Sequence, residues 1–406
     1  MTKKSDAPAI RFKGFSDAWE QRKARELFVS TADKGYPELP VLSATQDRGM
    51  IRRDENSINI FHDKKNEAGY KRVLPGQFVI HLRSFQGGFA HSAIEGITSP
   101  AYTVFGFSEP EKHDSEYWKY VFTSKSFIQR LETVTYGIRD GRSISYEEFL
   151  TLGFVYPSKV EQTAIARYLD KLSDLITLHQ RKFEKLTNVK KSMLEKMFPQ
   201  NGSSYPEIRF KGFTDPWEQR KLSEMCGTFE YGLNAAAKEF DGKNKYIRIT
   251  DIDDASREFL LSDLSSPDIC LDGMSKYLLS SGDIVFARTG ASVGKTYIYR
   301  ENDGIVYFAG FLIRAKVKQD NNAEFVFQST LSPSYEKYIR ITSQRSGQPG
   351  VNAQEYGEYD LFAPSKEEQQ RIGHFLQGID NLITLHQREL EKLQNIKKSM
   401  LEKMFV

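Results

Sequence analysis

The chain has 406 residues, a formal net charge of +3 and only two cysteines, Cys226 and Cys270. This length allows more than one domain with its own hydrophobic core, and the small net charge argues against a simple polyelectrolyte binder. Two cysteines can form neither a disulfide framework nor a four-cysteine zinc site. The start, MTKKSDAPAIRF, lacks the apolar segment of a signal peptide, and no run of 18 apolar residues follows. We therefore expect a soluble, cytoplasmic protein.

Each half of the chain begins with the same short segment. PAIRFKGFSDAWEQRK (Pro8–Lys23) returns as PEIRFKGFTDPWEQRK (Pro206–Lys221). In the first copy, Ile10, Phe12 and Trp19 alternate with charged residues, which is typical of a segment that packs against a neighbouring element. The repeat predicts two copies of one structural plan.

A variable region follows each short segment. In the first, Ala24–Tyr156, LPGQFVIHLRSF predicts a turn and a strand, AYTVFGF predicts a strand, and SEYWKYVFTSKSFIQRLETV predicts one amphipathic helix. The second, Leu222–Ala363, has SGDIVFARTG, FAGFLIRAKV and EFVFQSTLSPSYEKYIRITS in the corresponding order. Residue identity between the two regions is low. We expect mixed α/β domains that share a fold but differ in their surfaces.

Each variable region leads into a long helix, Glu161–Phe198 or Glu368–Phe405. The segments LITLHQR and KKSMLEKMF are identical in both copies, and apolar residues recur in steps of three and four. This spacing predicts a coiled-coil seam. The two helices, each about 57 Å long at 1.5 Å per residue, are expected to pack antiparallel on each other, related by a pseudo-twofold axis. His179 and His386 fall within the seams, where we expect them to fix the register.

The repeats define the expected domain bounds. The first globular domain spans residues 1–156, including the short segment 8–23, and the first helix spans 157–198. Residues 199–205 form a linker rich in Pro, Gly and Ser. The second globular domain spans 206–363, including the short segment 206–221, and the second helix spans 364–406.

No catalytic signature is present in the sequence. Gly290–Thr296 reads GASVGKT, but only three residues separate its glycines where a P-loop has four, and the next residues resemble a strand rather than a helix. A glycine-rich hairpin is the better interpretation. Dinucleotide-binding, zinc-deaminase, serine-elbow and adenine-methyltransferase motifs are missing. We therefore expect no catalytic residue, no metal site and no cofactor site in this chain.

Polar side chains gather at glycine-containing turns in both variable regions. Arg or Lys can read guanine, and Asn or Gln can read adenine, through paired hydrogen bonds in the major groove of DNA. For each single residue an ordinary solvated loop stays an alternative. The candidates are Gln46, Arg48, Arg83, Ser84, Gln86, Arg139, Arg142 and Ser143 in the first region, and Arg248, Thr250, Arg288, Thr289, Ser292, Lys295, Gln344, Arg345 and Gln348 in the second.

Four features together resemble one known family. They are the Pro-Ser-Lys-x-Glu-Gln helix starts (Pro157–Gln162 and Pro364–Gln369), the two LITLHQR segments, SGDIVFARTG, and SGQPGVN (Ser346–Asn352). This layout is similar to the specificity subunit of type I restriction–modification systems over essentially the whole chain. The first variable region departs from the last two features.

The resemblance implies two target-recognition domains, each reading one half of a bipartite site in double-stranded DNA, and an antiparallel coiled coil that sets the gap between the halves. It also implies two modification (methyltransferase) subunits and restriction/motor subunits as partners, with the methyl donor, ATP and magnesium bound only by those partners, and no membrane. Two other hypotheses are an adaptor whose paired domains bind protein or carbohydrate, and an enzyme with an unrecognised site. A split DNA consensus with a fixed gap would separate the first hypothesis from these two.

Overall fold

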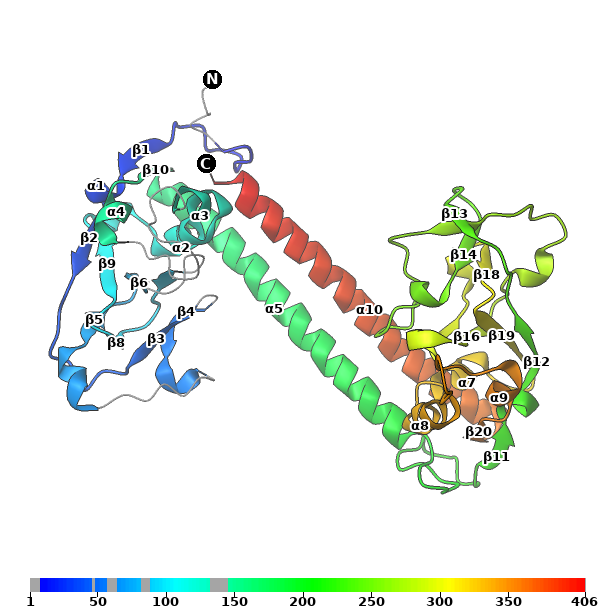
Figure 1. Ribbon diagram of the computed structural model, residues 1–406. Coiled ribbons are helices and arrows are strands. Elements are labelled where there is room, and N and C mark those ends of the chain that lie inside the picture. Colours follow the sequence, from blue (N-terminus) through cyan, green and yellow to red (C-terminus); the bar gives the residue numbers. More distant parts are fainter. Residues whose placement is uncertain (1–7, 46–47, 57–63, 82–87, 132–144, 406) are drawn as a thin grey trace. The chain divides into compact units, whose positions relative to one another are not determined.

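The computed structural model describes residues 8–45, 48–56, 64–81, 88–131 and 145–405 (Figure 1). The chain divides into two compact units: unit 1 is Met1–Leu178 with Leu390–Val406, and unit 2 is His179–Glu389. Two helices of 38 residues, α5 (Lys159–Lys196) and α10 (Lys366–Lys403), each contribute residues to both units. They begin two residues before Glu161 and Glu368, the starts predicted from the repeated helical segments.

Unit 1 combines short strands with short helices. Its strands are β1 (Glu20–Lys23), β2 (Phe28–Thr31), β3 (Leu42–Thr45), β4 (Gly49–Arg52), β5 (Lys71–Val73), β6 (Phe78–Ile80), β7 (Phe89–His91), β8 (Gly96–Thr98), β9 (Thr103–Phe107) and β10 (Gly153–Tyr156). Its other helices are α1 (Ala24–Leu27), α2 (Ser115–Thr123), α3 (Lys125–Leu131) and α4 (Tyr146–Leu150), with 3-10 turns η1 (Arg53–Glu55), η2 (Lys64–Gly69) and η3 (Pro110–Lys112).

Unit 2 has a similar inventory. Its strands are β11 (Glu218–Lys221), β12 (Cys226–Tyr231), β13 (Ala237–Glu239), β14 (Lys245–Ile247), β15 (Ser265–Pro267), β16 (Asp283–Ala287), β17 (Thr296–Ile298), β18 (Val306–Phe308), β19 (Leu312–Val317) and β20 (Asp360–Ala363). Its other helices are α6 (Leu222–Met225), α7 (Ala323–Ser329), α8 (Pro333–Thr342) and α9 (Ala353–Gly357), with 3-10 turns η4 (Ile249–Asp251), η5 (Ser275–Tyr277), η6 (Gly290–Ser292) and η7 (Glu301–Asp303).

The two units share one sheet plan. Unit 1 has a four-stranded antiparallel sheet in the order β2-β9-β6-β7, and unit 2 has the order β12-β19-β16-β17. In both, the strand of the short N-terminal repeat pairs with the strand that leads into the long helix, β1 with β10 and β11 with β20. The expected mixed α/β fold with two β-rich parts and two long helices is confirmed.

One predicted helix is two helices. Residues Ser115–Leu131 of the segment SEYWKYVFTSKSFIQRLETV form α2 and α3, which break at Ser124, and its last three residues lie outside the described ranges. The Ser124 hydroxyl donates to the carbonyl of Val121 (2.7 Å) and accepts from the N–H of Phe127 (3.2 Å), so it ends one helix and starts the next. The corresponding segment of unit 2 breaks at Ser332 before Pro333, for the same capping reason.

The short N-terminal repeats are packing segments, as expected. The ring of Phe12 meets Tyr168 of α5 edge-on, with centroids 5.5 Å apart, and Phe210 meets Phe375 of α10 at 5.8 Å. Trp19 is buried in the aromatic core of unit 1, and the equivalent Trp217 is buried in the core of unit 2.

Within unit 2 the two long helices run antiparallel. His179 lies against His386, with their Nδ1 atoms 3.1 Å apart, and Lys190, eleven residues later in α5, pairs with Asp380, six residues earlier in α10. The end of α5 enters the unit 2 core beside the start of α10, whereas Met404 near the chain end packs in the unit 1 core. None of the helices in the described ranges combines the length and apolarity that a membrane span requires.

Candidate nucleic-acid interface

A buried ion pair joins each short repeat to the start of its long helix. In unit 1, Arg11 binds Glu161 through Nε–Oε1 (2.7 Å) and Nη2–Oε2 (2.8 Å). In unit 2, Arg209 binds Glu368 with the same two contacts at the same distances. Each glutamate is only 1% exposed. The bidentate geometry fixes the direction in which each helix leaves its domain.

The next residue of each helix anchors a short helix of the same unit. The side-chain carbonyl of Gln162 accepts from the N–H of Asp114 (2.9 Å), which is the N-cap of α2. Gln369 accepts in the same way from the N–H of Asn322 (3.0 Å), the N-cap of α7. The Glu-Gln pair that marks both helix starts in the sequence therefore serves to attach the domain to its helix.

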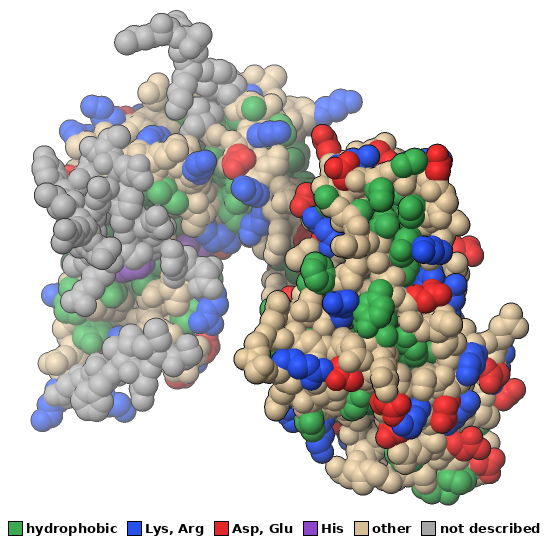
Figure 2. Space-filling view, turned by 45° about the vertical axis from the view of Figure 1, so that its right-hand side comes forward, with side chains coloured by type: hydrophobic (Ala, Val, Ile, Leu, Met, Phe, Trp, Pro, Cys, Tyr) green, Lys and Arg blue, Asp and Glu red, His purple; other side chains and the backbone are tan. Residues whose placement is uncertain are grey.

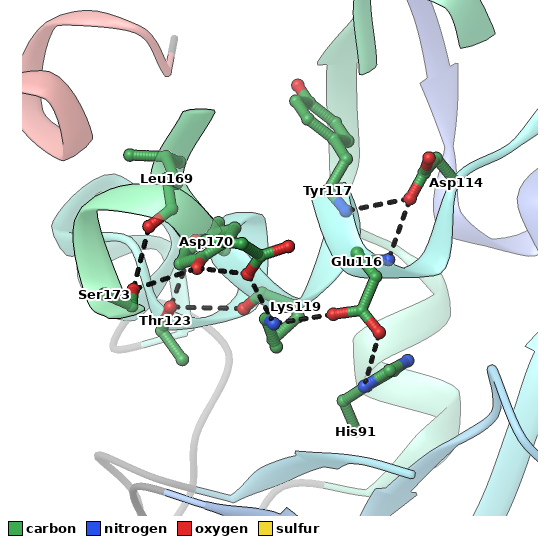
Figure 3. A network of polar contacts seen from close by, with 10 residues as sticks. His91, Asp114, Glu116, Tyr117, Lys119, Thr123, Leu169, Asp170 and Ser173 are labelled. Carbon is green, nitrogen blue, oxygen red and sulfur yellow. Dashed lines mark hydrogen bonds and ion pairs between the residues drawn. The ribbon is translucent and has the colours of Figure 1, made fainter. Parts of the chain in front are cut away.

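A polar network ties α2 to α5 in unit 1 (Figure 3). Glu116 accepts from Lys119 (2.6 Å) and lies 3.8 Å from Nδ1 of the buried His91. Lys119 also reaches Asp170 of α5 (3.1 Å), which accepts from the hydroxyl of Tyr120 (2.7 Å). Burial lowers the pKa of His91, against the opposing effect of Glu116. Burial raises the pKa of Tyr120 to about 12, so this hydroxyl stays a donor.

Unit 2 has a different network at the corresponding junction. Gln328 of α7 donates to Glu324 (2.9 Å) and to Asp380 of α10 (2.7 Å). Asp380 also binds Lys190 of α5, and Arg300 binds Glu324 (3.1 Å). Burial raises the pKa of Glu324 and lowers the pKa of Lys190. The same junction is thus built from different side chains in the two units.

The Gly290–Thr296 segment is a hairpin connection between β16 and β17, and the strand that follows it confirms that it is no P-loop. The structure brings this hairpin together with the Ser346–Asn352 segment. The N–H of Gly290 donates to the carbonyl of Pro349 (3.0 Å), and a Cβ at Gly290 would lie 2.8 Å from the amide nitrogen of Gln348. Arg288 and Thr289 of one candidate loop and Gln348 of another therefore belong to one surface.

Three other candidate cations of unit 2 are engaged by carboxylates. Arg248 binds Asp251 through two contacts, Lys295 lies 2.5 Å from Asp254, and Arg345 binds Glu355. Their charges are thereby neutralised within the chain. Arg288 has no such carboxylate partner among the described residues.

The remaining candidates are exposed or half-buried, or lie outside the described residues. Gln344 and Thr250 are exposed, Ser292 is half-buried in the hairpin turn, and Arg48 lies exposed in the turn between β3 and β4. The unit 1 candidates that fall outside the described residues are Gln46, Arg83, Ser84, Gln86, Arg139, Arg142 and Ser143.

Two aromatic residues that the sequence analysis did not select lie beside Arg288. Tyr231 is 45% exposed and Phe311 is 58% exposed. Each adjoins a glycine, Gly232 or Gly310, and an exposed aromatic at a glycine turn is the signal that would have identified them. On the face of unit 2 in Figure 2, hydrophobic side chains lie among charged side chains of both signs, as the small net charge indicates.

Comparison with known proteins shows a similarity to one family. Residues 214–395 match the model of the type I restriction modification DNA specificity domain. The chain is 26% identical over 255 residues to the type I restriction enzyme MjaVIII specificity subunit of Methanocaldococcus jannaschii, which covers 60% of this chain and 59% of the relative. It is 25% identical over 214 residues to the putative MjaX specificity subunit of the same organism, covering 50% of this chain and 49% of the relative. The chain thus aligns with roughly half of the length of these relatives.

A solved structure has the same fold. The crystal structure of the type I restriction–modification S subunit from M. genitalium aligns with 98% of this chain and 99% of its own, with a TM-score of 0.60 and 16% identity. The residues that match the family model, 214–395, lie almost entirely in unit 2 and include most of α10. In sequence and in fold, the chain is thus similar to specificity subunits of type I restriction–modification systems.

Proposed function

We propose that this chain is the DNA-recognition subunit of a type I restriction–modification complex and has no catalytic role of its own. Residues 1–156 and 206–363 are the two recognition domains, and each reads one half of a bipartite, gapped site in double-stranded DNA. Partner subunits then methylate adenine in that site or restrict the DNA. Such a protein works where the host DNA lies, in the cytoplasm.

The observation that carries the proposal is that both units repeat the same contacts at the start of their long helix, here called the frame, while their loops differ. The Arg–Glu pair and the glutamine anchor repeat with nearly equal distances in both units. The loops that this frame supports differ in sequence. A protein that reads two unlike half-sites needs this combination, because positioning must be equivalent while base contacts must differ.

The long helices offer equivalent exposed apolar residues for partner subunits. Leu175 and Leu178 of α5 are 43% and 46% exposed, and Leu382 and Leu385 at the same repeat positions of α10 are 46% and 51% exposed. Two equal surfaces suit two copies of one modification subunit. In this proposal the methyl donor, ATP and magnesium are bound by the partners.

The first lysine of each KKSMLEKMF copy already has a partner within the chain and is not available to such a subunit. Lys190 is paired with Asp380, and the side chain of Lys397 lies over the ring of Tyr120 (5.8 Å). Their neighbours Lys191 and Lys398 are exposed. Charge reversal at these two exposed lysines therefore tests partner binding without disturbing the packing of the helices.

Selection from random duplex DNA tests the function directly. The full chain, purified together with the subunits that accompany it, is expected to enrich a split consensus with a fixed gap. Methylated adenines in the host genome should fall in that consensus and disappear when the chain is deleted. Repeated rounds without enrichment would contradict the proposal and favour an adaptor that binds protein or carbohydrate.

A further inference from the structure

Three backbone segments of unit 2 meet at Arg288. The N–H of Arg288 donates to the carbonyl of Phe311 (3.0 Å), and its carbonyl accepts from the N–H of Val351 (2.9 Å). A Cβ at Gly232 would lie 2.1 Å from the carbonyl oxygen of Ala309. Glycine is therefore required at position 232, where the end of β12 passes the turn that carries Phe311.

The guanidinium of Arg288 lies beside two aromatic rings. Its Cζ is 5.1 Å from the ring centroid of Tyr231 and 5.9 Å from that of Phe311, which are cation–π distances. The Tyr231 hydroxyl accepts from the N–H of Ala353 (3.3 Å), so the Tyr231 ring is itself held. Ring contacts of this kind restrict the guanidinium but leave its N–H donors free. The donors lie in the plane of the guanidinium, and a ring face does not accept hydrogen bonds from them there.

Arg288 differs in this respect from other arginines of unit 2. Arg248, Arg300 and Arg345 place their guanidinium groups on Asp251, Glu324 and Glu355. A carboxylate takes up two donors and cancels the charge. Within the described part of the chain no carboxylate does this for Arg288, so its donors are available to an acceptor outside the protein.

The surroundings favour a base edge as that acceptor. A fixed, planar guanidinium presents two parallel N–H donors, which match O6 and N7 of guanine in the major groove. A phosphate accepts the same two donors, but its hydration would be lost beside two largely apolar rings. Restricting the side chain before binding also lowers the entropy lost when the contact forms.

We propose that Arg288, with Tyr231 and Phe311 as its positioning residues, reads a guanine in the half-site bound by unit 2. This inference rests on the proposed function and adds to it the base, the groove and the residue. It predicts that the half-site whose recognition is lost when unit 2 is mutated contains at least one G·C pair.

Base analogues test the contact atom by atom. Each guanine of the consensus is replaced in turn by 7-deazaguanine, which lacks the N7 acceptor, or by inosine, which lacks only the minor-groove amino group. At one guanine of the unit 2 half-site, 7-deazaguanine should weaken binding by the full complex about 10- to 100-fold. Inosine at the same position should change it little.

Protein variants test whether Arg288 and its aromatic neighbours cause the loss of binding seen with 7-deazaguanine. Arg288→Ala should abolish the 7-deazaguanine penalty at that position and leave mismatch penalties in the other half-site unchanged. Phe311→Leu should reduce the penalty, and Phe311→Tyr, which keeps a ring, should restore it. Arg340→Ala removes an exposed charge from α8 and should leave the penalty intact.

The outcomes separate this inference from the proposed function. Absence of any split consensus overturns both. A split consensus with no 7-deazaguanine penalty in the unit 2 half-site, or with a penalty that persists in Arg288→Ala, overturns the guanine contact alone. A uniform loss of affinity for all sequences in Arg288→Ala, with the salt slope reduced by about one, would identify a phosphate contact instead.

Discussion

The guanidinium of Arg209 binds both carboxylate oxygens of Glu368, at 2.7 and 2.8 Å, and the glutamate is almost completely buried. Arg209 lies in the short repeat and Glu368 in the first turn of α10. The pair therefore connects the chain segment that enters the second domain with the helix that leaves it. Arg11 and Glu161 make the same two contacts in unit 1, so this connection belongs to the structural plan that the two units share.

Removing one member of this pair should destabilise unit 2. Arg209→Ala leaves a buried carboxylate without its partner, which costs about 3 kcal/mol of unfolding free energy. Hydrogen exchange of unit 2 peptides would measure the loss. Arg220→Ala is the control, because its pair with Glu224 is longer (3.8 Å) and more exposed, so less than about 1 kcal/mol should be lost. Equal effects of the two changes would contradict the conclusion that the Arg209–Glu368 pair stabilises the junction between the short repeat and α10.

Two glycines of α10 should respond oppositely to alanine. A Cβ at Gly373 would lie 2.6 Å from Oδ1 of Asn322 and 2.9 Å from the N–H nitrogen of Phe325, whereas a Cβ at Gly378 meets nothing within 4 Å. Gly378→Ala should stabilise the helix by up to about 1 kcal/mol. Gly373→Ala should destabilise unit 2 by about 1–3 kcal/mol, because α7 must shift.

Thermal unfolding of the two single variants, followed at Trp217 in the core of unit 2, would measure both effects. The unit 1 position equivalent to Gly373 is Ala166, which is buried, so the requirement for glycine is specific to unit 2. A stabilised Gly373→Ala variant would show that α7 does not approach α10 as closely as described.

Acidification should loosen the helix pair at its histidines. Burial, then the neighbouring His179 and Lys182, lower the pKa of His386 below its usual range. In the unfolded chain the histidine titrates near about 6.5, so below that pH the unfolded state binds more protons than the folded state. The stability of unit 2 should therefore fall as pH drops through this range.

Hydrogen exchange of α5 and α10 between pH 7.5 and pH 5.5, corrected for intrinsic exchange, would detect this change. In His386→Gln the pH dependence should become flatter. In His374→Gln, which changes an exposed histidine of the same helix, it should persist. An unaltered pH dependence in His386→Gln would assign it to another group.

The two long helices, which are proposed to set the gap between the half-sites, can be lengthened. Seven residues inserted after Leu178 in α5 and after Glu389 in α10, where the compact units divide, preserve the heptad and the contacts within each unit. The added length is about 10 Å, so the gap between the half-sites should grow by about three base pairs. Selection from random DNA would read out the new gap.

The half-sites themselves should be unchanged by the double insertion. Insertion into α5 alone shifts the seam of one helix against the other and should abolish specific binding. A gap that stays constant in the double insertion would show that something other than helix length determines the spacing.

Local sequence signals correctly predicted the elements that depend on local chemistry. The spacing of apolar residues predicted α5 and α10 within two residues at their starts, and the motif SGDIVFARTG predicted β16 and its glycine turn. The break at Ser124 was missed, because apolar periodicity continues through it and only the capping hydrogen bonds reveal two helices.

The candidate site was predicted less completely. The sequence selected Arg288 and Gln348 by residue type, and the same rule selected Arg248 and Lys295, which are engaged by carboxylates. Residue type gives the hydrogen-bonding capacity of a side chain but not its partner. Phe311 was not selected, because an aromatic residue in a β-rich region more often lies in a core than on a surface.

The sequence by itself determined that the chain is a duplication, that two long helices pair, and that each β-rich part has its own loops. These properties follow from repeats and from periodicity, which are local along the chain. Only the tertiary structure decided which cations keep free donors, since that depends on carboxylates distant in sequence, as Lys295 and Asp254 show. It also decided that Tyr231, Arg288 and Phe311 form one surface, because the backbone contacts that assemble them join three separate segments.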